Sequence, residues 1–359
     1  MWIKVLLCIQ EADYARRLSS FYNKEYRDKI EINIVENMEQ AISFSKDNGI
    51  DIALFDSVYE SAMINAVEKK EMACFCAILA DRLYESNDNI IRIQKYQRAD
   101  NLYKEILDTY ANHGKVKVSR RTSVGGSCKV YTFISPKGGS GTTTVAKAYA
   151  RKRAFYEKVL YINLQPMVTP IQSEVREGGM DDIIMALKSR RNILGIKLQS
   201  AVSKGVDQVE YFEASTNPMD MMDLTKDDMV NLINGVRELN VYQKVIFDLG
   251  DNITSREVEL MKQADFNVCV VDNEESCLSK FERLYKLLEA VGQREKVQLL
   301  RKTEIFKNKW VRGLETLYED YSVVKSGWAP LITDRNNEGV IERIAYSDSF
   351  DNLGIEHAE

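Results

Sequence analysis

Short apolar runs alternate with amphipathic stretches through residues 1–117. Apolar runs of strand length occur at 3–9, 30–35, 52–55, 74–79 and 90–93. Helical stretches accompany them at 14–22, 38–46 and 99–111. Buried strands that alternate with helices are typical of a parallel sheet covered on both faces. We therefore predict a doubly wound α/β domain here.

The same alternation resumes at residue 129 and predicts a second doubly wound, parallel-sheet α/β domain over 129–359. Its strands are predicted at 130–134, 159–162, 209–212, 242–248, 266–271 and 297–300. Its clearest helices are predicted after the first strand to about 156, and at 226–239 and 276–291. Residues 118–128 are basic, small and glycine-containing, which predicts a linker between the domains.

Composition narrows the class of protein. A chain of 359 residues has room for about two domains. Its net charge of -5 argues against a surface built for nucleic-acid phosphates or anionic lipid, so we expect no specific nucleic-acid partner and no direct membrane insertion. The six cysteines form no C-x-x-C pair and favour reduced core thiols in a cytoplasmic protein.

A glycine-rich stretch lies between the strand at 130–134 and the helix that follows it. Three glycines within four residues let successive backbone N–H groups turn toward one point, and the helix adds the positive end of its dipole. The alternative is a glycine-rich turn without a ligand. The stretch predicts a cradle for a triphosphate, made by Lys137, Gly138, Gly139, Ser140, Gly141, Thr142, Thr143 and Thr144.

This cradle departs from the standard G-x-x-x-x-G-K-[ST] pattern at two positions. Pro136 replaces the first glycine, and Thr142 replaces the lysine. The strand at 242–248 ends in Asp248, which is a plausible Walker B carboxylate. In a P-loop protein such an aspartate binds Mg²⁺, usually through water, and the Thr143 hydroxyl would bind the ion directly. We therefore expect ATP and Mg²⁺ as cofactors.

The run Lys137-Gly-Gly-x-Gly followed by Thr142 and Thr143 resembles the deviant P-loop of the MinD/ParA family of dimerising ATPases. The resemblance implies a homodimer in which Lys137 reaches the partner's nucleotide. It also implies that Thr142 stands where the family has its other phosphate-binding lysine. Residues 330–334 are similar to the family's last strand and base-contacting loop.

The resemblance also bears on ATP hydrolysis. The family's Asp-x-Asp after the second strand reads Asn163 and Gln165 here. An amide can orient a water molecule, but it cannot accept the proton that a carboxylate would take. We expect slow hydrolysis or none; if the protein is an enzyme, it is a weak Mg-dependent ATP hydrolase.

The first domain is similar in order and size to a response-regulator receiver, a flavodoxin-like fold. Asp56 falls where receivers carry the phosphate-accepting aspartate, and Lys95 falls where they carry the lysine that pairs with the phosphoryl group. Ile9 and Gln10 stand where receivers place the acidic pair that binds Mg²⁺, which indicates an atypical receiver with a degenerate phospho-site. We favour an Asp56–Lys95 pair over phosphorylation of Asp56.

A receiver-like domain followed by a MinD/ParA-type domain resembles the TadZ/CpaE pilus-assembly family. The resemblance rests on Asp56, Lys95, residues 137–144, Asn217-Pro218 and Asp248. It implies an ATP-binding, dimerising scaffold that positions the Tad pilus machinery and is recruited through partners to a cell pole or to the membrane-bound machinery. One alternative is an active ParA-like ATPase that cycles between dimer and monomer to position cargo. A two-component transcription regulator is less favoured, because the sequence contains no recognisable DNA-binding module.

Overall fold

The computed structural model describes residues 3–27, 29–81, 90–113, 128–168, 179–189, 193–205, 207–311, 318–334 and 336–354. The chain divides into two compact units. The first comprises Met1–Ser123 with Ser189–Ala201, and the second comprises Val124–Lys188 with Val202–Glu359. The predicted linker, 118–128, lies outside the described residues apart from Cys128.

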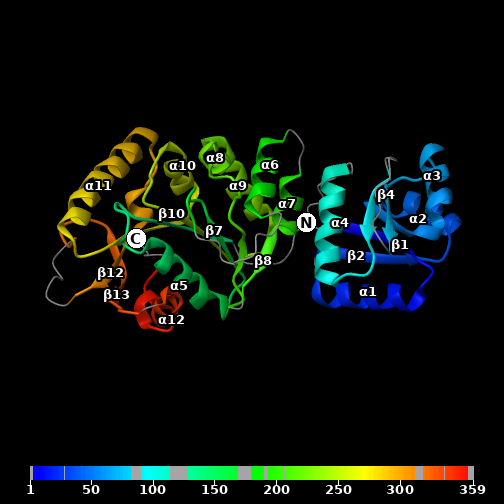
Figure 1. The fold of residues 1–359 in the computed structure, drawn as a ribbon. Helices are drawn as coiled ribbons and strands as arrows, with labels where there is room; N and C mark the ends of the chain where they lie inside the picture. The colour runs from blue at the N-terminus through cyan, green and yellow to red at the C-terminus, as the bar shows by residue number, and fades with distance from the viewer. Residues whose placement is uncertain are drawn as a thin grey trace. The chain divides into compact units, whose positions relative to one another are not determined.

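The first unit is built on a five-stranded parallel sheet of order β2-β1-β3-β4-β5 (Figure 1). This is the flavodoxin-like strand order, so the predicted fold class is confirmed. The strands are β1 (Ile3–Cys8), β2 (Ile30–Val35), β3 (Ile52–Asp56), β4 (Phe75–Ala80) and β5 (Arg92–Gln94). The helices formed by the N-terminal part of the chain are α1 (Ala12–Glu25), α2 (Met38–Asp47), α3 (Glu60–Glu68) and α4 (Ala99–His113).

A short helix from the middle of the chain also belongs to the first unit. This helix, α7 (Leu194–Ser200), packs on α4. The buried Lys197 ammonium lies 3.1 Å from Asp108 Oδ1, and the Tyr103 hydroxyl donates to Gln199 Oε1 over 3.3 Å. The first unit is therefore discontinuous in sequence, which the apolar pattern did not indicate.

The second unit is built on an eight-stranded sheet of order β13-β12-β11-β6-β10-β7-β9-β8. Its strands are parallel except for β8, which runs antiparallel to β9. The bounds are β6 (Lys129–Ile134), β7 (Val159–Asn163), β8 (Val202–Lys204), β9 (Glu210–Phe212), β10 (Lys244–Gly250), β11 (Phe266–Val271), β12 (Thr303–Trp310) and β13 (Val324–Pro330).

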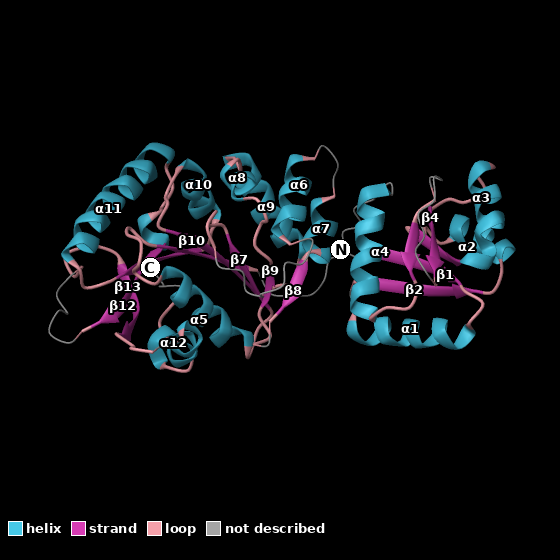
Figure 2. Ribbon diagram, in the orientation of Figure 1, coloured by secondary structure: helices cyan, strands magenta, loops and turns pink. Residues whose placement is uncertain are grey.

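Helices cover both faces of this second sheet (Figure 2). On one face α5 (Thr142–Ala154) and α12 (Asn337–Ala345) pack together in an apolar core that includes Val145, Ile246 and Ile341. The remaining helices are α6 (Met180–Lys188), α8 (Pro218–Met222), α9 (Lys226–Leu239), α10 (Ser255–Gln263) and α11 (Glu275–Glu295). The described residues include no helix that is long and apolar enough to cross a membrane.

Two strand predictions for the second unit were wrong. Residues 297–300 are not a strand, because α11 ends at Lys296 in a left-handed conformation (φ 56°) and the Val297 N–H donates back to Gly292 O. The strand that follows α11 is β12, whose lysines and asparagine interrupt its apolar pattern. The last strand is β13 and not 330–334; polar and small residues within β13 interrupt its apolar run.

Candidate functional site

The glycine-rich stretch joins the carboxyl end of β6 to the first turn of α5. Gly139 and Gly141 have φ values of 82° and 87°, a conformation that side chains other than glycine adopt only with strain. A Cβ at Gly141 would overlap Asn308 Nδ2, and one at Gly138 would lie 2.9 Å from Asp251 Oδ2. The loop therefore needs glycine both for its turns and for its close neighbours.

A cavity of about 370 Å³ opens over this loop. Its polar lining comes from the loop from Lys137 to Thr144, without Ser140, and from Gln165, Asp251 and Lys309. Its mainly apolar lining comes from the segment at the end of β13 and from α12, namely Pro330, Leu331, Ile332, Asn337, Val340 and Ile344. The segment that is similar to the family's base-contacting loop therefore lies at the same cavity as the cradle.

The two predicted metal ligands meet at the floor of the cradle. Asp248 is fully buried at the end of β10, where the Tyr161 hydroxyl donates to its Oδ2 over 2.8 Å and the Gly250 N–H donates to its Oδ1 over 3.2 Å. Burial raises the pKa of Asp248, while hydrogen bonds from Thr143 and Tyr161 oppose that rise. A carboxylate beside a threonine hydroxyl is a donor set that suits Mg²⁺ when phosphate oxygens complete it.

The two amides at the end of β7 take different positions. Gln165 lines the cavity, and its Nε2 donates to Thr143 Oγ1 over 2.9 Å. Asn163 lies beside the buried carboxylate, since its Nδ2 is 3.4 Å from Asp248 Oδ2. Gln165 therefore contacts the hydroxyl expected to bind the metal, whereas Asn163 contacts the buried carboxylate.

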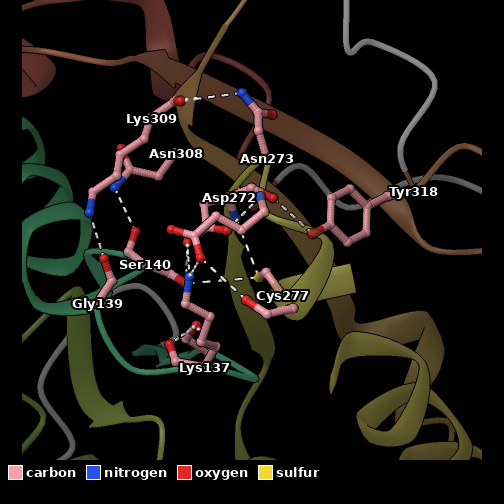
Figure 3. Close-up of polar contacts among 12 residues, drawn as sticks. Lys137, Gly139, Ser140, Asp272, Asn273, Cys277, Asn308, Lys309 and Tyr318 are labelled. Carbon is pink, nitrogen blue, oxygen red and sulfur yellow. Dashed lines mark hydrogen bonds and ion pairs between the residues drawn. The ribbon is translucent and has the colours of Figure 1, made fainter. Parts of the chain in front are cut away.

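Lys137 is held by two carboxylates that the sequence reasoning missed. Its Nζ lies 3.2 Å from Asp272 Oδ2 (Figure 3) and forms a second ion pair with Glu274. Burial lowers the pKa of Lys137, but the hydrogen bonds to Glu274 and Asp272 outweigh it and raise that pKa. Asp272 also accepts from Ser140 Oγ over 2.9 Å, so the Ser140 side chain faces away from the cavity. The available signal was two acids directly after the apolar run of β11.

The predicted phospho-site of the first unit is occupied by an ion pair. Lys95 Nζ lies 2.6 Å from Asp56 Oδ1 and 3.0 Å from Glu11 Oε1, and the Gln10 N–H donates to Asp56 Oδ2 over 2.8 Å. Asp56 and Lys95 are both buried. The pair favoured from the sequence is therefore present, and its carboxylate is already bonded on both oxygens.

Removing the buried charge at Asp248 is expected to stabilise the fold and to weaken Mg²⁺-dependent nucleotide binding. The Asp248→Asn side chain keeps the shape but removes a carboxylate that burial disfavours. Melting temperature in EDTA should rise, whereas ATP affinity with Mg²⁺ should fall by about tenfold or more. A variant that melts lower and binds Mg²⁺–ATP as the wild type does would contradict this role of Asp248.

The family of the first domain follows from its sequence. Residues 1–111 match the family model described as TadZ-like, receiver domain. The first domain is similar to TadZ-like receiver domains. The comparison with curated proteins finds no match.

The fold of the second unit is similar to that of a ParA family ATPase. A ParA family ATPase from Chlorobium tepidum TLS is 16% identical with a TM-score of 0.50, over 62% of this chain and 96% of that chain. At that identity the likeness shows the fold alone. The chain therefore joins a domain that matches the TadZ-like receiver family model to a second domain whose fold is similar to that of a ParA family ATPase.

Two further solved structures match with lower TM-scores. A putative plasmid partition protein from Borrelia burgdorferi B31 bound to AMPPNP is 14% identical, over 61% of this chain and 98% of that chain, with a TM-score of 0.48. A septum site-determining protein MinD complexed with Mg-ADP from Pyrococcus horikoshii OT3 is 14% identical, over 60% of this chain and 86% of that chain, with a TM-score of 0.43.

Proposed function

We propose that the second domain binds ATP with Mg²⁺ and that the nucleotide joins two copies of the chain into a scaffold for Tad-type pilus assembly. The observation that carries this proposal is the cavity over the glycine-rich loop, which is lined both by the polar cradle and by apolar residues. That arrangement suits a nucleotide, whose phosphates need N–H donors and whose base needs apolar contact.

The residues of the polar lining have separable roles in this proposal. Backbone N–H groups of the loop from Gly138 to Thr143 bind phosphate oxygens, and the N-terminus of α5 adds its dipole. Thr143 and Asp248 hold the metal. When bound, Mg²⁺ neutralises part of the phosphate charge.

Hydrolysis in this proposal is slow or absent. Gln165 and Asn163 carry amides, which orient water but do not take its proton. One observation favours the alternative, an active ATPase that cycles between dimer and monomer. Asp251 lines the cavity close to Gly138, so its carboxylate could accept a proton from an attacking water.

The deciding experiment measures the light-scattering mass of the purified chain with Mg²⁺ and ATP, and phosphate release in the same samples. A stable dimer with negligible phosphate release is expected. Matched samples with ADP, and with ATP plus EDTA, should remain monomeric. Dimerisation that decays as phosphate appears would favour the cycling ATPase, and a monomer under every condition would reject the scaffold.

Restoring the carboxylates is expected to raise phosphate release. The double change Asn163→Asp and Gln165→Asp supplies the acidic groups that the MinD/ParA pattern has, and a positioned base contributes about 100-fold or more. Thr142, which lacks the phosphate-binding ammonium, should limit the gain to about tenfold. Asp251→Asn in the wild-type background is the matched control. Loss of a measurable basal rate in that variant, with no gain in the double variant, would identify Asp251 as the working base.

The cellular role rests on the family of the first domain. We place the dimer in the cytoplasm, recruited to a pole or to membrane-bound pilus machinery by protein partners. A fluorescent fusion should form foci that coincide with a pilus-machinery component. The foci should disperse when ATP binding is blocked by Gly141→Val. Diffuse fluorescence of the wild type, or binding to promoter DNA, would favour a different role.

A further inference from the structure

Lys309 interrupts the end of β12 with a left-handed backbone. Its φ is 54°, and the pairing of β12 with β13 shifts by one residue between Lys307 and Trp310, which is a β-bulge. Of the other left-handed residues in the described parts of the chain, Asn240 and Lys296 lie at the ends of helices, where that conformation closes the helix, whereas Gln208 and Tyr318 lie in a bend and a turn. Lys309 differs from all four, because it lies within a strand, at a bulge.

The bulge turns the side chain of Lys309 toward the phosphate cradle. In a regular strand, residues two apart share a face, so Lys309 would follow Lys307. Lys307 contacts Glu319 over 2.8 Å and lies over the Trp310 ring. Lys309 Nζ instead lies 2.6 Å from Gly139 O, and its side chain lines the cavity (Figure 3).

Two side-chain amides hold the bulge in place. Asn308 Nδ2 donates to Ser140 O over 2.8 Å, and Asn273 Nδ2 donates to the carbonyl of Lys309 over 3.3 Å. Asn308 is buried. The bulge is therefore tied to the cradle on one side and to the segment after β11 on the other.

The charges around the cavity indicate what Lys309 does. ATP brings roughly four negative charges, and the standard P-loop lysine is replaced by Thr142. The ammonium of Lys137 is already paired with two carboxylates. Lys309 lines the same cavity with its ammonium on a neutral carbonyl, Gly139 O. It can move from that carbonyl to a phosphate without giving up an ion pair.

We propose that Lys309 supplies the phosphate-binding ammonium that Thr142 cannot, from a different strand of the sheet. The proposal rests on the proposed function, that the cavity binds a nucleoside triphosphate. The left-handed backbone of a lysine is strained, and such strain gathers where it positions a functional group. On nucleotide binding, Lys309 Nζ leaves Gly139 O and donates to a phosphate oxygen.

The test compares Lys309→Ala, Lys309→Arg and Lys309→Gly by calorimetric titration with Mg²⁺ plus ATP, ADP or AMP. Lys309→Ala should lower the affinity for ATP and ADP by about tenfold or more, because it removes a charge-assisted hydrogen bond to the outer phosphates. The affinity for AMP should change little. Lys309→Arg should retain most of the affinity. Lys307→Ala, which removes a neighbouring lysine that faces away, should bind as the wild type does.

Lys309→Gly separates strain from function. Glycine relieves the left-handed backbone, so this variant should melt above the wild type and still bind ATP as weakly as Lys309→Ala. If Lys309 is purely structural, its variants should have lower melting temperatures and should lose equal affinity for ATP and AMP. That result would overturn the proposal. Restoring the standard lysine with Thr142→Lys should recover ATP affinity in the Lys309→Ala background. A folded double variant that gains nothing would also count against it.

The outcomes separate this inference from the proposed function. If the folded wild type binds no ATP, the proposed function fails and takes the role of Lys309 with it. If the wild type binds ATP, Gly141→Val abolishes binding and Lys309→Ala leaves it unchanged, only the role of Lys309 fails.

Discussion

Replacing Gly141 by valine is expected to abolish ATP binding, with affinity lowered by at least about 100-fold. Gly141 has a φ of 87°, and a Cβ there would overlap Asn308 Nδ2. Valine therefore meets both a strained backbone and a buried amide at the point where α5 begins. Calorimetric titration with Mg²⁺ and ATP measures the loss.

A glycine in the first unit serves as a control for the effect of backbone strain at a positive φ. Gly49 has a φ of 61°, and an added Cβ there would meet nothing within 4 Å. Gly49→Val should lower the melting temperature through strain alone and leave ATP affinity unchanged. Tight ATP binding by folded Gly141→Val protein would reject the cradle as the nucleotide site.

Replacing Lys137 by alanine is expected to remove the ATP-dependent dimer while each monomer still binds ATP. In the proposed dimer this lysine acts on the partner's nucleotide, so its loss weakens association more than binding within one chain. A charge-assisted contact made once by each copy predicts a loss of about 100-fold in dimer affinity. Light-scattering mass across a concentration series with Mg²⁺ and ATP measures it.

The contacts of Lys137 supply the control for that result. Glu274 pairs with Lys137 and is exposed, so Glu274→Gln removes one of the two ion pairs of the lysine without emptying a buried position. If Lys137 must break its ion pairs with Asp272 and Glu274 before two chains associate, this variant should dimerise at lower protein concentration than the wild type. A Lys137→Ala protein that dimerises as the wild type does would instead confine the lysine to its own chain.

The parts that the sequence predicted share one physical origin. Strands such as β2 and β11 are buried on at least one face and bounded by turns, so they read as separate apolar runs. The cradle and Asp248 were predictable because glycine spacing and a strand-end acid are local signals. The structure brings Thr143, Asp248 and Gln165 together in three dimensions, as the parallel order of their strands requires.

The parts that the sequence did not predict depend on long-range packing. Asn308 and Lys309 belong to β12, in which consecutive polar residues lie toward the end of the strand. No continuous apolar run therefore indicated this strand. Asp272 and Glu274 become meaningful only when the loop after β11 reaches Lys137. The short helix α7 contains no signal that it packs on α4, far away in the sequence.

The Asp56–Lys95 pair has a consequence for how the protein is controlled. A working receiver offers a free carboxylate that a phosphodonor can modify, whereas both oxygens of Asp56 are engaged by Lys95 and the Gln10 N–H. While that pair persists, we expect Asp56 to be a poor acceptor for a phosphoryl group. In the proposed function, control of assembly then rests on nucleotide binding by the second domain. Assembly would then depend on the local concentrations of the protein and of its nucleotide, and not on a phosphorylation signal.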